Sequence, residues 1–347
     1  WGPEEGQIER YCRDAAALGA TEVIVNLLPE SYHPGRIEDP MNAYSRFFRW
    51  GPSLDMFFST ALNTDIWPRE MLARNRKVML RAAEIGRKHG LKPLVLMGEP
   101  RYQPERFFER HPHLRGPRVD NPNTTAVRPY YAPCIDTEEM REHYREMMGQ
   151  LMEAIPDLQG MFFYNGDSAT GLCHSEGLYA GPHGPRFCED IPPGKRLLDF
   201  VELLLSAARE TNPDFNLWMF HYIGGAERQY VLDNSSEHIS GIATATFATG
   251  SLEDAFANWK YGSDIEDVGY REAVRERQND AREQLEELRT RGKPEMTEIT
   301  LPHEEWIAPL RAVPYPFQAL EMLEDIAEVS EHLFFYGHWP DPNIVPY

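Results

Sequence analysis

Apolar positions along the chain follow two alternating spacings, one typical of helices and one typical of buried strands. The helical spacing predicts helices over residues 8–18, 69–89, 137–155, 195–210, 226–232, 270–291 and 316–329. Short β-branched or apolar runs predict strands at residues 22–27, 92–97, 160–164, 215–221, 238–244, 295–300 and 332–336. Because each strand follows a helix, the chain repeats one helix–strand unit.

The connections between these elements are asymmetric in length. The turns from helix to strand have only a few residues, whereas the loops from strand to helix are far longer than the usual ~2–6 residues. These long loops span residues 28–68, 98–136, 168–194, 245–269 and 301–315. Enlarged loops on one side of a parallel sheet are typical of an α/β barrel with its site at the carboxyl ends of the strands.

We therefore predict one α/β domain over residues 1–347, a (β/α)8 barrel of the TIM type with long strand-to-helix loops. The first of its eight strands is expected to precede Trp1, so that residues 22–27 form the second strand and residues 160–164 the fourth. A doubly wound open sheet is the alternative.

The charge of the chain restricts its partners. It has 35 Lys and Arg residues against 55 Asp and Glu residues, for a formal net charge of -20. This excess of acid would repel phosphate backbones, so no nucleic acid partner is expected. No run approaches the ~20 apolar residues of a membrane helix, so a soluble protein without a membrane partner is expected. A carbohydrate suits such a surface; localisation and homo-oligomer formation stay open.

Three carboxylates follow or lie within predicted strands and are the candidate catalytic residues. Asp167 comes directly after the apolar strand 160–164, beside Gly166, which permits a tight backbone turn. Glu298 lies inside the strand 295–300, where either orientation leaves little water around it, so its pKa is expected to be raised or its charge paired. Glu99 ends the strand 92–97 in a comparable way. For each, the alternative is a structural hydrogen bond or ion pair.

Amide, imidazole and aromatic side chains near the predicted strand ends are candidates for substrate binding. Aromatic faces stack on the C–H faces of sugar rings, while polar side chains bind the hydroxyl groups. The alternative for many of the aromatic residues is packing of the long loops onto the barrel. The candidates are Asn165, His221, Tyr222, His174, Trp218, Trp259, Trp306 and Trp339.

The four cysteines are too few for a disulfide scaffold. Cys173 and Cys188 flank one loop; free thiols are favoured there, and a disulfide between the two is the alternative. The same loop contains further metal-capable residues, His174, Glu176 and His183, but their spacing matches no zinc motif. No metal and no cofactor are therefore expected.

The segment Met161-Phe-Phe-Tyr-Asn-Gly-Asp167 resembles the fourth-strand motif of glycoside hydrolase barrels, namely the family 20 β-hexosaminidases, which end that strand in Gly-Gly-Asp-Glu, and also the α-glucuronidases. The stretch 107–115 and the loop 178–185 are similar to segments of such barrels. In the hexosaminidases the Asp orients the acetamido group of the substrate and the Glu is the general acid. Here Ser168 replaces that Glu, so the resemblance extends only to Asp167, and the acid is expected to be Glu298 or Glu99.

These features favour an exo-acting glycoside hydrolase, acting on an N-acetylhexosaminide or another modified sugar. One alternative is a metal-dependent sugar isomerase or epimerase in which Glu99, Asp167, His221 and Glu298 bind Mg²⁺ or Mn²⁺. The other is a carbohydrate-binding barrel without catalysis. The absence of a Glu beside Asp167 is the reason to consider it.

Overall fold

A computed structural model describes residues 5–17, 19–26, 52–119, 130–166, 170–175, 184–221, 225–243, 247–248, 279, 282–293, 295–300 and 333–336. The chain divides into two compact units, Trp1–Ile239 and Ser240–Tyr347. Both units contain parallel strands.

The first unit has four neighbouring parallel strands that follow one another in chain order. Their register is continuous, since Leu96 lies opposite Phe162 and Phe162 opposite Trp218. Parallel neighbours require a crossover between them, and helices supply it here. The strands are β1 (Glu22–Ile24), β2 (Lys92–Gly98), β5 (Gly160–Asn165) and β6 (Asn216–His221).

Helices precede the strands of this unit as the apolar periodicity predicts. Thr137 caps the helix before β5, where its hydroxyl accepts a hydrogen bond from the Met140 N–H at 3.3 Å, and two glutamates follow in the first turn. The helices are α1 (Glu5–Ala17), α3 (Arg69–Lys88), α5 (Glu138–Ala154), α6 (Pro193–Arg209) and α7 (Gly225–Asn234).

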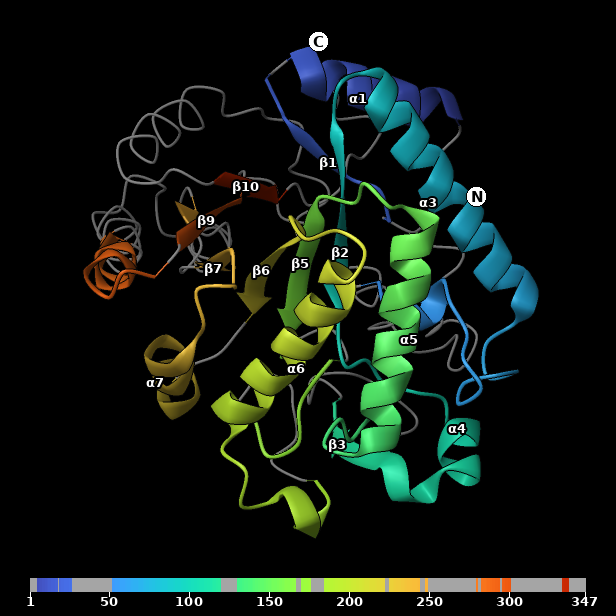
Figure 1. Cartoon of the computed structure of the whole chain (residues 1–347), viewed down its shortest axis with the longest axis vertical. Coiled ribbons are helices and arrows are strands. Elements are labelled where there is room, and N and C mark those ends of the chain that lie inside the picture. Colours follow the sequence, from blue (N-terminus) through green and yellow to red (C-terminus); the bar gives the residue numbers. More distant parts are fainter. Residues whose placement is uncertain are drawn as a thin grey trace, which may run out of the picture. The chain divides into compact units, whose positions relative to one another are not determined.

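The helices α3, α5 and α6 cover one face of these strands (Figure 1). On β5, Phe163 points to this face and meets the ring of Phe200 from α6, with ring centroids 5.9 Å apart. Tyr144 of α5 meets the same ring edge-on at 4.8 Å. Because strand side chains alternate, Phe162 and Trp218 lie on the opposite face, where their rings stack at 5.0 Å.

Short elements occupy the long loops of the first unit, and the sequence did not predict them. After β2 the chain forms a helix and a two-stranded antiparallel hairpin before it enters α5. These additional elements are η3 (Leu54–Met56), α4 (Glu105–Arg110), η4 (Pro112–Leu114), β3 (Arg115–Arg118), β4 (Tyr131–Pro133) and η5 (Arg186–Cys188).

In the second unit the strands are again parallel. Both β8 and β10 pair with β9, and β7 pairs with its beginning. Residues 282–290 are helical, in the segment predicted as the helix 270–291, while the predicted helix 316–329 lies outside the described residues. The strands are β7 (Gly241–Ala243), β8 (Phe247–Ala248), β9 (Glu295–Thr300) and β10 (Leu333–Tyr336).

The α/β class and the parallel strands predicted from the sequence are confirmed, and β9 has the predicted bounds. The strand β7 is shorter than the predicted range 238–244, since it covers only Gly241–Ala243. Closure into an eight-stranded barrel, and a single domain over the whole chain, stay predictions. No helix in the described part of the chain is both long and apolar enough to cross a membrane.

Candidate active site at the carboxyl ends of the strands

Three of the predicted site residues end neighbouring strands of the first unit at the same level. Asn165 is the last residue of β5 and lies opposite His221, the last residue of β6. Glu99 follows β2 directly, and its backbone N–H donates to the Tyr164 carbonyl at 3.0 Å. The parallel register therefore brings these three positions to one edge, as the sequence predicted.

The chain turns sharply where β5 ends. Gly166 has a φ of 87°, in the left-handed region that a residue with a Cβ enters only at a cost. The tight turn expected at this glycine is thus confirmed. Asp167, which follows it, lies outside the described residues.

Asn165 links the ends of β5 and β2. Its side chain is buried, and its Nδ2 donates a hydrogen bond of 2.6 Å to the Glu99 carbonyl. A buried amide bonded in this way fixes the spacing of the two strand ends.

Glu99 is fully buried on the helix-covered side of the strands. Its Oε1 accepts a hydrogen bond of 2.6 Å from the Leu54 N–H, the first residue of η3. Its Oε2 accepts from the Tyr144 hydroxyl at 3.1 Å and from the Ser53 hydroxyl at 3.4 Å. The carboxyl group thereby connects β2, the η3 segment and helix α5.

The burial of Glu99 changes its acidity. Removal from water is the larger cause, and the negative charge of Asp55 the smaller one, of a rise in the pKa of Glu99 to about 8. The three hydrogen bonds to the carboxyl group oppose this rise. The carboxyl group therefore holds its proton near neutral pH. The same burial, with Glu99 nearby, raises the pKa of Tyr144 well above its usual value.

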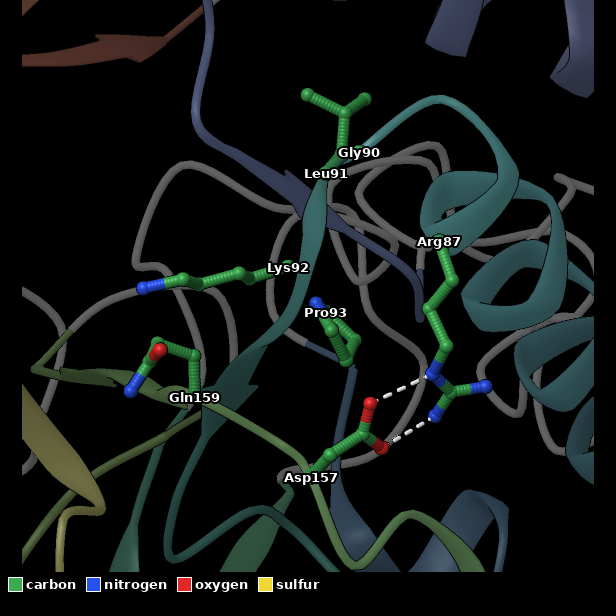
Figure 2. A pocket seen from close by; sticks show the side chains of 7 residues that line it. All are labelled: Arg87, Gly90, Leu91, Lys92, Pro93, Asp157 and Gln159. Atoms are coloured by element: carbon green, nitrogen blue, oxygen red, sulfur yellow. Dashed lines mark hydrogen bonds and ion pairs between the residues drawn. The ribbon is translucent and has the colours of Figure 1, made fainter.

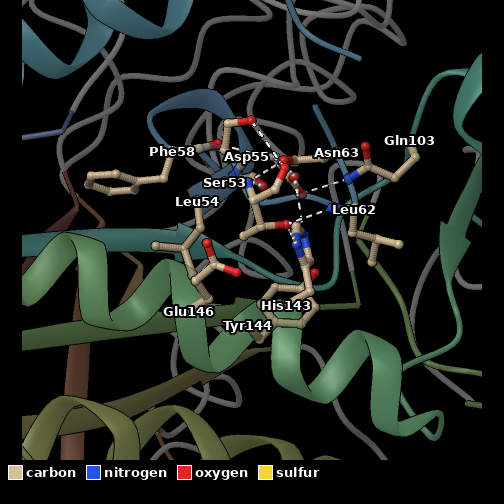
Figure 3. Close-up of polar contacts among 12 residues, drawn as sticks. Ser53, Leu54, Asp55, Phe58, Leu62, Asn63, Gln103, His143, Tyr144 and Glu146 are labelled. Atoms are coloured by element: carbon tan, nitrogen blue, oxygen red, sulfur yellow. Dashed lines mark hydrogen bonds and ion pairs between the residues drawn. The ribbon is translucent and has the colours of Figure 1, made fainter. Parts of the chain in front are cut away.

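Figure 3 shows a second buried carboxylate, Asp55, which the sequence analysis missed and whose charge acts on Glu99. Asn63 and Gln103 donate hydrogen bonds to it, the latter at 2.6 Å from Nε2 to Oδ2. The Nε2 atom of His143 lies 3.4 Å from Oδ1 of Asp55, and the other ring nitrogen lies 2.7 Å from the Thr60 hydroxyl. All five side chains are buried, so this network fastens the loop before α3 to helix α5.

The remaining predicted site residues are less closely grouped. Trp218 is stacked on Phe162 in the middle of β6, and His174 lies in a turn after β5 with its Nε2 3.3 Å from the Pro185 carbonyl. Glu298 belongs to β9 in the second unit, with its side chain outside the described part. The other predicted residues, Tyr222, Trp259, Trp306 and Trp339, lie outside the described residues together with Asp167.

Residues that can hold a metal gather elsewhere in the first unit. Cys173 and Cys188 lie together, as their shared loop suggested, but their neighbours are Cys134 and Asp136. A hydrogen bond from Cys173 lowers the pKa of Cys188 to about 6. Hydrogen bonds with Cys134 first, and then with Cys188, raise the pKa of Cys173. The other metal-capable residues of the loop, 176 and 183, lie outside the described residues.

A surface hollow of about 350 Å³ lies at the opposite, amino-terminal end of the strands (Figure 2). Across it, the guanidinium of Arg87 from α3 donates two hydrogen bonds to Asp157, of 2.6 and 2.5 Å. The hollow also borders Lys92 and Gln159, at the start of β2 and before β5. This end of an α/β sheet contributes to stability rather than to catalysis, so the hollow is not the candidate site.

The sequence matches no protein-family model and no curated protein. Solved structures to which the chain is similar include a GH36 alpha-galactosidase, AgaA from Geobacillus stearothermophilus, in complex with stachyose. It is 11% identical, with a TM-score of 0.48 over 98% of this chain, which spans only 38% of that chain's length.

This chain matches a larger share of two further solved structures. Cel5A of Thermotoga maritima, in complex with mannotriose, is 11% identical, with a TM-score of 0.43 over 82% of this chain and 75% of that one. The pneumococcal virulence factor StrH, described with N-glycan recognition and hydrolysis, is 11% identical, with a TM-score of 0.47 over 99% and 76%. These identities and TM-scores are too low to assign a family.

Proposed function

We propose that the chain is an exo-acting glycoside hydrolase whose site lies at the carboxyl ends of its parallel strands. The observation that carries this proposal is the common level at which β2, β5 and β6 end, with Gly166 turning the chain immediately before Asp167. Polar groups that end adjacent parallel strands are where α/β enzymes place their chemistry.

Most glycoside hydrolases use two carboxyl groups, one of them protonated. Asp167 provides one of these two carboxyl groups in this proposal, since it follows the left-handed residue Gly166 at the end of β5. Glu99 has a suitably raised pKa but no access to a substrate, because both of its oxygens are occupied and the side chain is fully buried. Glu99 is therefore given a positioning role in this proposal, and Glu298, in the second unit, stays the sequence-based candidate for the general acid.

The substrate in this proposal is a carbohydrate, an N-acetylhexosaminide or another modified sugar, with Asn165, His221 and Tyr222 near its hydroxyl groups. Asn165 supports the site indirectly, because its amide is bonded to the Glu99 carbonyl.

The proposal is tested with purified protein on a panel of 4-nitrophenyl glycosides that includes N-acetylhexosaminides and uronides. One glycoside is expected to be hydrolysed, with kcat reduced by ~10²-fold or more in Asp167→Asn and Glu298→Gln. Glu153→Gln, an exposed glutamate on α5, is the matched control and is expected to keep full activity.

Further measurements separate the other hypotheses. No release of 4-nitrophenol, together with an interconversion of free sugars that disappears in EDTA and returns only with Mg²⁺ or Mn²⁺, would favour the isomerase. Sugar binding without turnover, unchanged in Asp167→Asn, would favour a binding protein, and turnover unaffected by either substitution would refute the assignment of the two carboxylates.

A further inference from the structure

Three cysteines and one aspartate that are distant in the sequence meet in the interior of the first unit. Cys134 follows β4, Asp136 precedes α5, Cys173 lies in the turn after β5, and Cys188 ends η5. Their sulfur and carboxylate oxygen atoms all lie within 4.8 Å of one another. Each cysteine is exposed by 1% or less.

The distances within this cluster suit four ligands around one ion. In a tetrahedral zinc site with Zn–S bonds of about 2.3 Å, neighbouring sulfurs are separated by about 3.8 Å. The Sγ atoms of Cys134 and Cys188 are 3.9 Å apart, and Sγ of Cys134 is 3.8 Å from Oδ2 of Asp136. The four cysteines of the chain carry free thiols.

A buried arginine holds the segments that carry these donors. The side chain of Arg196, from α6, donates to Oδ2 of Asp136 at 2.6 Å, to the Cys188 carbonyl at 2.6 Å and to the Cys173 carbonyl. It therefore orients the carboxylate and two of the cysteine-bearing turns at once. Its charge, together with that of a divalent cation, would offset most of the charge of three thiolates and a carboxylate.

The backbone around the cluster is also closely fitted. A Cβ added to Gly184 would lie 2.6 Å from the Cβ of Cys173 and 3.1 Å from its sulfur. The backbone at Gly184 therefore packs against Cys173 so closely that a residue with a Cβ would clash. The three cysteines are closed to solvent. A closed set of four ligands is typical of structural rather than catalytic zinc sites.

We propose that Cys134, Cys173, Cys188 and Asp136 bind one thiophilic divalent cation, Zn²⁺ above all, in a buried structural site. The ion joins the end of the β3–β4 hairpin, the turn after β5 and the segment before α6. On binding, the thiols that are still protonated release their protons to solvent, and all three cysteines coordinate as thiolates. This site is independent of the proposed glycosidase chemistry.

The first test measures the metal directly. Protein purified under reducing conditions without chelator is expected to contain one Zn²⁺ per chain by mass spectrometry of its metals. After removal of the metal, titration with Co²⁺ is expected to give thiolate-to-cobalt charge-transfer bands in the near ultraviolet and tetrahedral d–d bands in the visible. Both sets of bands saturate at one Co²⁺ per chain.

Matched variants locate the site. Cys134→Ser and Cys188→Ser are expected to weaken Co²⁺ binding by ~10²-fold or more, since loss of a direct ligand exceeds the ~10–100-fold effect of losing a supporting hydrogen bond. Cys12→Ser, in α1, removes an equally buried thiol outside the cluster and is expected to leave the spectrum unchanged. If a cluster variant does not fold, Asp136→Asn and the wild-type spectrum still test the proposal, because band intensity reports the number of thiolates.

Three results would overturn the inference. The first is folded wild-type protein that contains no metal and gives no charge-transfer band. The second is a wild-type mass lower by two hydrogen atoms, with a disulfide mapped among the three cysteines. The third is a cobalt spectrum that survives both cluster substitutions and is lost in Cys12→Ser.

Discussion

At the scale of single residues, the protonation of Glu99 makes a contribution to stability that depends on pH. Its pKa is about 8 in the folded chain because the carboxyl group is buried next to Asp55, against a usual value of 4.5. A group with a raised folded pKa binds its proton more tightly in the folded state. Its stabilising contribution is therefore full below about pH 4.5 and is lost as the pH rises through about 8.

Glu99→Gln should remove this dependence, because glutamine resembles the protonated acid in shape and cannot ionise. We expect the variant to be close to wild type at pH 5 and more stable than wild type at pH 9, by roughly 2–5 kcal/mol. Urea denaturation at both pH values measures the difference. Stability curves that run parallel across this range would show that Glu99 does not titrate as described.

The candidate site could be predicted from the sequence only in part, because strand ends are local features and side-chain directions are not. The positions of Asn165 and Gly166 follow from where an apolar run stops. The contacts of Asp55 with His143 and Gln103 join a short 3-10 turn, a helix and a loop, and no spacing in the sequence indicates them. Which side of the sheet Glu99 faces likewise depends on its partners Leu54 and Tyr144.

At the scale of elements, the packing of β5 against β6 depends on a residue without a side chain. Gly160 begins β5, and a Cβ there would lie 2.5 Å from the Asn216 carbonyl oxygen and 2.5 Å from the Trp218 ring. The absence of a side chain at this position lets the indole ring lie over the strand and stack on Phe162. Because one obstacle is backbone, it cannot rotate away.

Gly160→Ala should therefore destabilise the protein by about 1–3 kcal/mol, the usual result of overpacking a core. Gly149→Ala is the matched control, since Gly149 lies in α5 with nothing within 4 Å of its added Cβ. There alanine should stabilise by roughly 0.5–1 kcal/mol, because it favours the helix. Thermal and urea unfolding of the two variants distinguish these effects, and equal changes of the same sign would contradict the description of β5.

Elements with a strong periodic pattern were predictable, and short ones were not. The helix before β5 carries its own start signal in Thr137 and two glutamates, and the structure begins α5 there. The hairpin β3–β4 has strands of only four and three residues, and one of them contains Gly116. Such strands form because tertiary contacts favour them, and local preference does not reveal them.

At the scale of the whole molecule, the excess of negative charge should oppose folding in dilute salt. The chain has a formal charge of -20 and a pI near 5.0. Raising NaCl from about 0.1 M to about 1 M shortens the Debye length from about 10 Å to about 3 Å and screens this repulsion. At pH 8 we expect the unfolding temperature to rise by roughly 2–5 °C.

The control is the same titration near pH 5.0, where the net charge is small and the rise should vanish. Differential scanning calorimetry measures both series. A salt effect of equal size at the two pH values would indicate general salting-out rather than charge repulsion.

The sequence also limited what could be predicted of the whole chain. Alternating helices and strands are sufficient for the α/β class, but whether such strands close into a barrel depends on tilt and stagger, which the sequence does not encode locally. The division into units after Ile239 falls inside the strand predicted at residues 238–244, where no change in composition marks it.

Because every cysteine is buried, thiol labelling can measure local opening of the chain. Cys12 lies in α1, whereas the other three thiols lie together between β4 and α6, and all are hidden from water. A thiol-specific reagent can modify them only while the surrounding segment is transiently open. In metal-free protein under native conditions, the labelling rates of Cys12 and of the other three would therefore report the opening free energies of two separate regions.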